Sequence, residues 1–318
     1  MKATGTLHNL GQSLWLDNIT RDLLNSGTLK RYIDELSVTG LTSNPTIFDQ
    51  AIKNSTAYDT SIREGLAQGK SGEALFFDLA LDDLTRAADL FRPVYDRTNG
   101  VDGWVSLEVS PLLAYDTKST IAAARDLHAR AGRPNLFIKI PGTKEGLPAI
   151  EETIFAGVPV NVTLLFSREH YVTAAEAYMR GIERRIAAGL NPQVGSVASV
   201  FISRWDGAAA GKIPAELTNQ LGIAIAGRTY KAYGEWLNSP AWQGTGGSEE
   251  SKSVSISAMY FHSFRDTTIV LSMAWFKSSG IFSFPLGCEN SLIALTSVAT
   301  RVTPSNVWSI ALGTSSSR

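Results

Sequence analysis

The fold is decided by a short run of residues, Leu136-Phe137-Ile138-Lys139-Ile140, in which every side chain but one is apolar. Such a run is typical of a parallel β-strand that is buried on both faces. The stretch before it, Ser119–Ala131, has a helical pattern, and Gly132 and Pro134 mark the end of that helix. A helix, a stop signal and a buried strand make one step of a parallel βα repeat.

The same step recurs along the first 243 residues. Further short apolar runs occur at Ser13–Leu16, Val38–Leu41, Val105–Val109, Val158–Thr163 and Gly195–Phe201. Amphipathic stretches lie between these runs, and they predict helices that begin near Ser71 and Ser167 and a helix over Glu216–Leu237. Six strands of this kind predict an α/β fold, a parallel (β/α)8 TIM barrel, with a doubly wound sheet as the alternative.

The pattern changes after residue 243. Gly244–Gly247 reads as a flexible break, and helical periodicity fades beyond it, although Ala258–Phe261 and Ile269–Phe276 can form strands or a helix. We therefore divide the chain into a β/α barrel domain, 1–243, and a divergent C-terminal segment, 244–318. Either this segment completes the barrel with divergent units, or it is a foreign tail that leaves the barrel incomplete or irregular at this end.

Composition excludes several classes of protein. The chain is 44% hydrophobic and 19% charged, as is ordinary for a soluble globular protein. A net charge of −1 gives no electrostatic reason to expect nucleic acid or an anionic membrane as a partner. The only cysteine, Cys288, excludes an intramolecular disulfide. Because no secretory signal, transit peptide or membrane-spanning stretch is visible, we expect a cytoplasmic protein, either a monomer or a homodimer.

Active sites of parallel barrels lie at the carboxyl ends of the strands. Almost every apolar run here contains, or ends on, a strongly polar side chain. These polar residues are Asp17, Asn44, Glu108, Lys139, Asn161, Thr163, Ser199 and Arg204. Each has a structural explanation when taken alone: a helix cap, a turn before Pro45, a backbone hydrogen bond, or an ion pair of Arg204 with Asp206. Their recurrence from strand to strand predicts one shared site.

Lys139 is the most informative of these residues. An ammonium group inside so apolar a run is desolvated, and an unpaired buried charge is costly. Proteins avoid that cost by pairing the lysine or by lowering its pKa until it is largely neutral, and a neutral buried amine is a good nucleophile toward a carbonyl carbon. Alternation puts Lys139 on the face opposite Ile138 and Ile140. The alternatives are a buried Lys139–Glu108 ion pair without chemistry, and Lys144 as a rival nucleophile.

The sequence offers no pattern for a metal or cofactor. The histidines are far apart and lack the spacing of metal ligands: His8, His128, His170 and His262. No glycine-rich phosphate loop follows a predicted strand, and no serine-nucleophile elbow is present. We therefore expect side chains alone to carry the chemistry.

Six motifs, one for each predicted strand, resemble those of the transaldolase family, class I Schiff-base-forming enzymes, and occur in the same order. They are Trp15-Leu16-Asp17, Gly40–Phe48, Ser106–Val109, Ile138–Pro141, Val160–Ser167 and Ser199–Arg204. The resemblance covers about residues 8 to 243, and 244–318 do not align. It implies a (β/α)8 barrel that transfers a dihydroxyacetone unit without a cofactor or metal. The donor would be sedoheptulose 7-phosphate or fructose 6-phosphate, and the acceptor glyceraldehyde 3-phosphate or erythrose 4-phosphate, as in the pentose phosphate pathway.

The resemblance also implies catalytic roles. Lys139 would form the Schiff base with C2 of the ketose, and the protonated imine would act as the electron sink for C3–C4 cleavage. Asp17 would remove the proton from the C4 hydroxyl and return it in the reverse step. Glu108 would move protons through a water that Thr163 helps to hold.

Substrate binding falls to a second set of residues. Asn44 and Asn161 would hydrogen-bond substrate hydroxyls, while Ser199 and Arg204 would bind the phosphate. Phe201 would limit the access of water, so that the bound unit is transferred and not released. The alternatives are a fructose-6-phosphate-type aldolase of the same family and a variant whose divergent C-terminus impairs catalysis.

Overall fold

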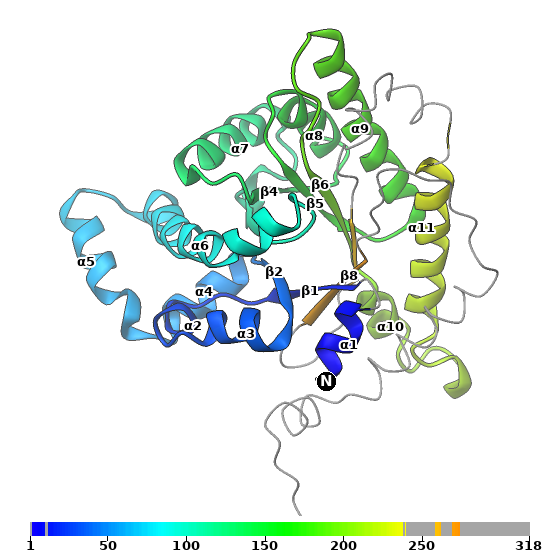
Figure 1. Cartoon of the computed structure of the whole chain (residues 1–318), viewed down its shortest axis with the longest axis horizontal. Helices are drawn as coiled ribbons and strands as arrows, with labels where there is room; N and C mark the ends of the chain where they lie inside the picture. Colours follow the sequence, from blue (N-terminus) through cyan, green and yellow to red (C-terminus); the bar gives the residue numbers. More distant parts are fainter. Residues whose placement is uncertain (1, 10–11, 238, 240–257, 262–268, 274–318) are drawn as a thin grey trace, which may run out of the picture.

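The computed structural model describes residues 2–9, 12–237, 239, 258–261 and 269–273. Within these residues the strands form one sheet that closes on itself in the order β1 to β8 (Figure 1). The strands are β1 Gln12–Asp17, β2 Val38–Thr42, β3 Val105–Glu108, β4 Leu136–Pro141, β5 Val160–Leu165, β6 Ser196–Val200, β7 Ala258–Phe261 and β8 Ile269–Met273.

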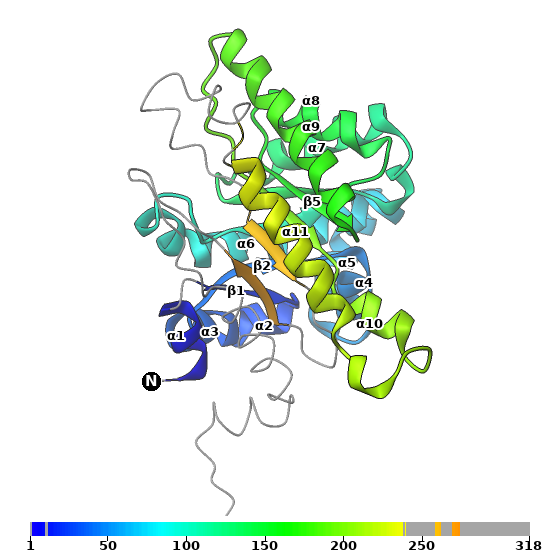
Figure 2. The same cartoon turned by 90° about the vertical axis from the view of Figure 1, so that its right-hand side faces the viewer.

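The first six strands confirm the predicted α/β, TIM-like alternation. Each pairs in parallel with the next strand along the chain, and helices connect them around the outside of the sheet. The consecutive order excludes the doubly wound alternative, in which the strand order reverses part-way across the sheet. Figure 2 shows α11 (Leu221–Leu237) on the outer surface, between α9 (Arg168–Ala187) and α10 (Ser203–Ala209). No helix in the described part of the chain has the length and apolar character to cross a bilayer.

The helices are α1 Ala3–Asn9, α2 Arg21–Asn25, α3 Thr28–Leu36, α4 Pro45–Lys53, α5 Asp59–Ala67, α6 Gly72–Arg97, α7 Thr117–Ala131, α8 Gly146–Phe155, α9 Arg168–Ala187, α10 Ser203–Ala209 and α11 Leu221–Leu237. The predicted stop after α7 is confirmed, because Gly132 takes a left-handed conformation with φ 56° and its N–H donates to the His128 carbonyl. The helix predicted over Glu216–Leu237 is shorter than expected. Asn219 is left-handed, with φ 62°, and separates a short 3₁₀ turn from α11.

The last two strands depart from the parallel repeat. Strand β7 pairs with β6 in parallel, whereas β8 is antiparallel to both β7 and β1. Only residues 262–268 separate the two strands, and a parallel crossover needs roughly a dozen residues or more. Antiparallel pairing is therefore the arrangement that this short connection permits. The rest of segment 244–318 lies outside the described residues, and the domain boundary at residue 243 stays a prediction.

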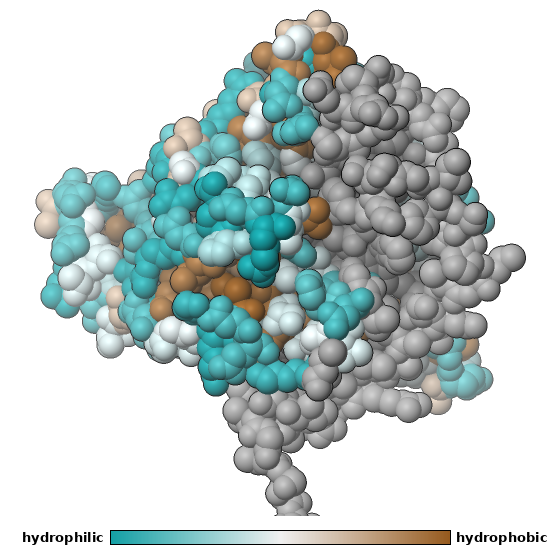
Figure 3. Space-filling view, viewed as in Figure 1, coloured by the Kyte–Doolittle hydropathy of each residue, from teal (hydrophilic) through white to brown (hydrophobic). Residues whose placement is uncertain are grey.

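Two layers of apolar side chains hold the sheet between its helices. Outward-facing strand residues such as Leu107, Ile138 and Val162 pack against the helices in the main core. A second cluster, Trp15, Trp104, Phe137 and Val197, fills the inside of the curled sheet. On the face seen in Figure 3 the described surface is mostly hydrophilic, and hydrophobic residues gather between α6 and the α2–α3 pair.

Gly103, which lies just before β3, allows the chain to pass close to the backbone of α6 at Tyr95. Its φ is +86°, and a Cβ built there would clash with the backbone nitrogen of Tyr95 and lie 2.6 Å from its Cα. We expect Gly103→Ala to lower the free energy of unfolding by about 3 kcal/mol, because left-handed strain adds to a clash that backbone cannot relieve. Urea unfolding measures the change.

Gly207 provides the control for that variant. It lies in α10, and a Cβ built there would meet no atom within 4 Å. Gly207→Ala is expected to be neutral or to stabilise the protein by up to about 1 kcal/mol. Equal effects of the two substitutions would contradict the assignment of Gly103 to a special backbone position.

Candidate active site

Lys139 lies on the inner face of β4 and is 2% exposed. Its strand neighbours Ile138 and Ile140 belong to the outer core, which confirms the predicted alternation. In the register of the sheet, Lys139 stands beside Glu108 of β3 and Asn161 of β5. Three adjacent strands thus present polar residues at the same level.

The Lys139 amine is held by two acceptors. Its Nζ lies 3.2 Å from Oε2 of Glu108, whose side chain is 14% exposed, and it donates to the carbonyl oxygen of Ser43 at 3.1 Å. The buried charge is therefore paired, as an ammonium in an apolar strand requires. This contact is expected both for a catalytic lysine and for a purely structural ion pair. The neighbouring groups distinguish the two roles.

Asn161 continues the polar layer toward β6. Its Nδ2 donates to Ser106 Oγ at 3.0 Å, and its Oδ1 accepts from Ser199 Oγ at 2.8 Å. All three side chains are buried. Buried polar side chains that hydrogen-bond in a chain are held in one geometry, so the Asn161 amide is fixed beside Lys139.

Thr163 adds a hydroxyl that has no hydrogen-bond partner among the described residues. It faces the same side of β5 as Asn161, is 1% exposed, and makes no side-chain hydrogen bond within the described residues. The strand bulges directly after it, where Leu164 takes φ 59° and the register with β6 shifts. A buried hydroxyl without a protein partner is a candidate for contact with a ligand.

Asp17 and Asn44 lie at the ends of β1 and β2. Asp17 is the last residue of its strand. Asn44 caps α4, because its Oδ1 accepts from the backbone N–H of Ile47 at 3.0 Å and Pro45 follows at the first helical position. Asn44 thus has a structural role, but it is that of a helix cap and not the turn expected before Pro45. The capping bond uses only the side-chain oxygen and leaves the amide nitrogen for other contacts.

Phe201 and Arg204 follow β6. The buried Phe201 ring stacks on Phe166 with centroids 5.4 Å apart, and the Arg204 guanidinium carbon lies 5.6 Å from the Phe201 ring centre. Arg204 is exposed at the start of α10. Asp206, proposed from the sequence as an ion-pair partner of Arg204, accepts from the backbone N–H of Gly222 at 3.0 Å. It therefore supports the start of α11.

Three aromatic side chains close the inside of the sheet beneath these groups. Together Trp15, Trp104 and Phe137 form what we call the aromatic floor. Trp104 stacks on Phe137 at 3.9 Å between centroids, and Trp15 follows at 6.3 Å from Phe137. Because side chains alternate, Phe137 lies one layer below Lys139 on the same face of β4, and Trp15 one layer below Asp17. The site around Lys139 and Asp17 thus lies on the side of the floor toward the carboxyl ends of the strands.

A buried carboxyl, Asp102, lies on the far side of the floor. It accepts a hydrogen bond from Ser13 Oγ at 2.8 Å. Burial raises the pKa of Asp102 above its ordinary value, and hydrogen bonds from Ser13 and Thr39 oppose the rise. Ser13 begins the inner face of β1 that ends at Asp17, so Asp102 belongs to the opposite end of the sheet from the site.

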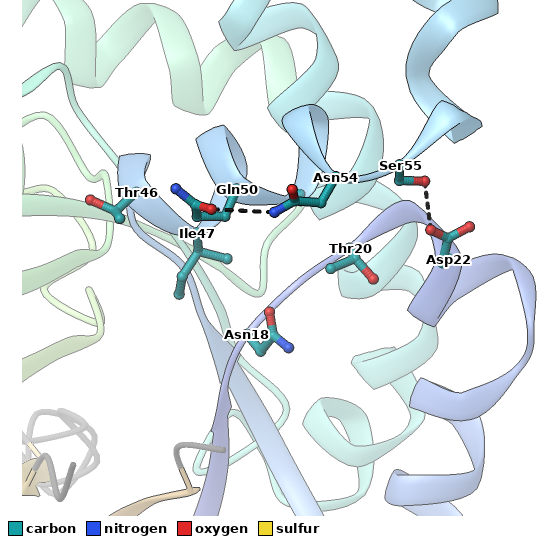
Figure 4. Close-up of a pocket in the computed structure, with 9 residues that line it drawn as sticks. Asn18, Thr20, Asp22, Thr46, Ile47, Gln50, Asn54 and Ser55 are labelled. Atoms are coloured by element: carbon teal, nitrogen blue, oxygen red, sulfur yellow. Dashed lines mark hydrogen bonds between the residues drawn. The ribbon is translucent and has the colours of Figure 1, made fainter. Parts of the chain in front are cut away.

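A pocket of about 370 Å³ lies beside the site, between the β1–α2 loop and α4 (Figure 4). Asn18 and Thr46 bring it close in sequence to Asp17 and Asn44. Two pairs in its wall hydrogen-bond to each other, Ser55 with Asp22 at 2.6 Å and Asn54 with Gln50 at 3.2 Å. The described residues that line it include one carboxylate and no basic side chain. The pocket is therefore unsuited to a phosphate, whose charge would face Asp22.

Two residues that hold the site together were not singled out from the sequence. Ser43 and Ser106 lie inside the motifs around Asn44 and Glu108, yet an uncharged serine carries little signal alone. Alternation gives one clue, because Ser106 lies two residues before Glu108 and so faces the same side of β3. Lys144, the rival nucleophile, is exposed in the loop after β4.

Comparison with known proteins identifies the class of this fold and site. The chain matches the family described as Transaldolase/Fructose-6-phosphate aldolase over residues 14–275, a span that extends past residue 243, where the resemblance seen in the sequence ends. A parallel βα sheet with a polar site at its strand ends agrees with that match. The chain belongs to the Transaldolase/Fructose-6-phosphate aldolase family.

Several curated relatives are similar over most of the chain. "Transaldolase 2" of Nostoc sp. (strain PCC 7120) is 42% identical over 250 residues, which cover 73% of this chain and 66% of the relative. "Transaldolase" of Trichodesmium erythraeum is 42% identical over 253 residues, with 74% and 67% covered. "Transaldolase" of Thermobifida fusca is 43% identical over 245 residues, with 74% and 66% covered. The chain thus spans about two thirds of the length of these relatives.

Proposed function

We propose that this protein is a transaldolase. It would transfer a dihydroxyacetone unit from a ketose phosphate, sedoheptulose 7-phosphate or fructose 6-phosphate, to glyceraldehyde 3-phosphate or erythrose 4-phosphate in the pentose phosphate pathway. The observation that carries the proposal is the Lys139 amine, buried on the inner face of β4 and 3.2 Å from a carboxylate that can take its proton. Family membership supports it.

Covalent catalysis would begin at Lys139. In its neutral form the amine attacks C2 of the ketose, and loss of water gives a protonated Schiff base. Glu108 is close enough to Nζ to accept a proton directly. The uncommitted Thr163 hydroxyl would hold the water through which Glu108 delivers protons to the departing oxygen. The positive imine then stabilises the electrons released when C3–C4 breaks.

Asp17 would act as the base for that cleavage. It ends β1, at the same edge of the sheet as the other strand ends. Removal of the C4 hydroxyl proton releases an aldose phosphate and leaves the three-carbon unit on Lys139. The acceptor aldehyde then takes this unit as Asp17 returns the proton.

Residues on several neighbouring strands would bind the sugar phosphate. The Asn161 amide, beside Lys139, and the free Asn44 nitrogen can hydrogen-bond substrate hydroxyls. Arg204 is the charged group suited to the phosphate. Ser199 was expected on the phosphate as well, but its hydroxyl donates to Asn161, so we assign it to the orientation of that amide. Phe201, packed between Phe166 and Arg204, would limit water access.

A fructose-6-phosphate-type aldolase is the second candidate, because the family description covers both activities. The two use the same Schiff base and differ in whether dihydroxyacetone is released. Product analysis with and without an acceptor aldose separates them: a transferase makes little free dihydroxyacetone and needs the acceptor, whereas an aldolase releases it in either case.

Reduction by borohydride tests the proposed Schiff base. The protein is incubated with fructose 6-phosphate, reduced and weighed intact, and the modified residue is located by peptide mass. We expect one added dihydroxyacetone-derived group, on Lys139. A fully unmodified protein, or an adduct on Lys144 alone, would contradict the proposal.

A further inference from the structure

Ser43 connects the end of β2 to both β3 and the Lys139 amine. It directly follows β2 and is 1% exposed. Its hydroxyl donates to the carbonyl oxygen of Ser106 at 2.7 Å, while its own carbonyl oxygen accepts from Lys139 Nζ at 3.1 Å. Donor and acceptor are unambiguous in both bonds, because a carbonyl only accepts and an ammonium only donates.

The hydroxyl of Ser43 holds a segment that has left the sheet. Strand β2 pairs with β3 through Leu41 and Thr42, and the paired register ends at Thr42 opposite Ser106. The bond from Ser43 Oγ to the Ser106 carbonyl is therefore a side-chain tether one residue beyond the register. It fixes the peptide whose carbonyl oxygen points at Lys139.

The two hydrogen-bond acceptors of the Lys139 amine, Glu108 and the Ser43 carbonyl, differ in what they can do as the Schiff base forms. Attack of Nζ on a ketone forms a C–N bond, and loss of water then breaks the C–O bond. An ammonium with three hydrogens and a carbonyl thus become an iminium with one N–H and one molecule of water. Of the contacts to Glu108 and Ser43, only one can survive as a hydrogen bond. A carboxylate can take up a proton and pass it on, whereas a backbone carbonyl cannot.

We propose that the Ser43 carbonyl is the acceptor that Nζ keeps throughout the Schiff-base cycle, and that the Ser43 hydroxyl is the tether that aims it. Ser43 is then a positioning residue, acting through its backbone, and Glu108 is the partner that exchanges protons. The inference rests on the proposed function. It predicts that loss of the tether slows the steps at nitrogen and leaves sugar binding largely intact.

Comparison of Ser43→Ala with Ser196→Ala tests the tether. Ser196 provides a matched control, because its buried hydroxyl also donates across strands, to the Val160 carbonyl at 2.9 Å, but at the opposite ends of β5 and β6 from the site. In Ser43→Ala we expect kcat and the rate of borohydride-trapped adduct formation to fall together by about tenfold, with KM within about twofold. Ser196→Ala is expected to match the wild type in all three quantities.

Thermal unfolding of both variants separates positioning from general destabilisation. Each loses one buried hydroxyl, so similar shifts in Tm are expected, and only Ser43→Ala should lose rate. If Ser43→Ala forms the adduct as fast as the wild type, the tether does not position Lys139 and the inference is overturned while the proposed function stands. If the wild type itself forms no adduct, the proposed function fails and the inference falls with it.

Discussion

Lys139→Ala is expected to abolish the borohydride-trapped adduct and to lower kcat/KM for dihydroxyacetone transfer by roughly four orders of magnitude or more, the scale on which removal of a covalent nucleophile acts. Among the described residues Lys139 is the only buried lysine, and all the others are exposed. Coupled assay of aldose phosphate release, together with intact mass after reduction, measures both effects.

Lys144→Ala is the matched control for the nucleophile. Lys144 lies five residues further on and is exposed in the loop after β4, so its loss is expected to leave the adduct and the rate within about twofold, as for an ordinary surface residue. A Lys139→Ala protein that keeps a ketose-dependent adduct would show that another amine is the nucleophile. Circular dichroism of the variant confirms that its fold is intact.

Truncation after Gln243 is expected to yield aggregated protein in place of a soluble enzyme. The described strands β7 and β8 pair with β6 and β1 and so cover both ends of the parallel sheet. Their removal would expose unpaired edges on two strands whose side chains belong to the core, which is a template for association between chains. We propose that closure by β7 and β8 is part of the working barrel.

The soluble fraction and the elution volume on gel filtration measure this effect. A second truncation, after Met273, serves as the control, because it keeps both closing strands and removes 274–318. A protein ending at Gln243 that is soluble, monomeric and fully active would show that closure is dispensable, whatever the longer truncation does.

The parallel part of the fold could be predicted because buried strands leave a dense apolar signal. The run around Lys139 is apolar on both faces, and each of the first six strands carries the same signature. The candidate site followed from the same pattern, since Lys139 and Glu108 interrupt apolar runs on adjacent strands. Their 3.2 Å contact is what that placement implies.

Contacts between distant, ordinary-looking residues could not be predicted. Arg21 and Asp83, 62 residues apart, form a buried ion pair at 2.9 Å, and Tyr58 donates to the same carboxylate at 2.8 Å. In the sequence Asp83 reads as one more polar residue of an amphipathic helix. Burial raises its pKa above the ordinary value, and the charge of Arg21 opposes the rise. Nothing local in the chain reveals such a partner.

The sequence allowed strands at Ala258–Phe261 and Ile269–Phe276, where β7 and β8 lie, but it did not reveal how they pair. The antiparallel pairing of β8 depends on the short connection between β7 and β8 and on which edges remain open. Periodicity over four or five residues does not specify direction, and it separates strand from helix poorly. The role of Ser43 could not be predicted either, because Lys139 contacts its backbone carbonyl, which every residue possesses, and its hydroxyl bonds to another backbone carbonyl.

The aromatic floor has a kinetic consequence. Since Phe137, stacked on Trp104, lies one layer below Lys139 on the inside of the sheet, a substrate proposed for Lys139 would approach from the carboxyl ends of the strands. The departing aldose phosphate and the incoming acceptor would then use the same side of the covalently bound fragment. Under the proposed function, the first aldose phosphate would have to leave before the acceptor arrives, so the aromatic floor predicts a ping-pong order of exchange.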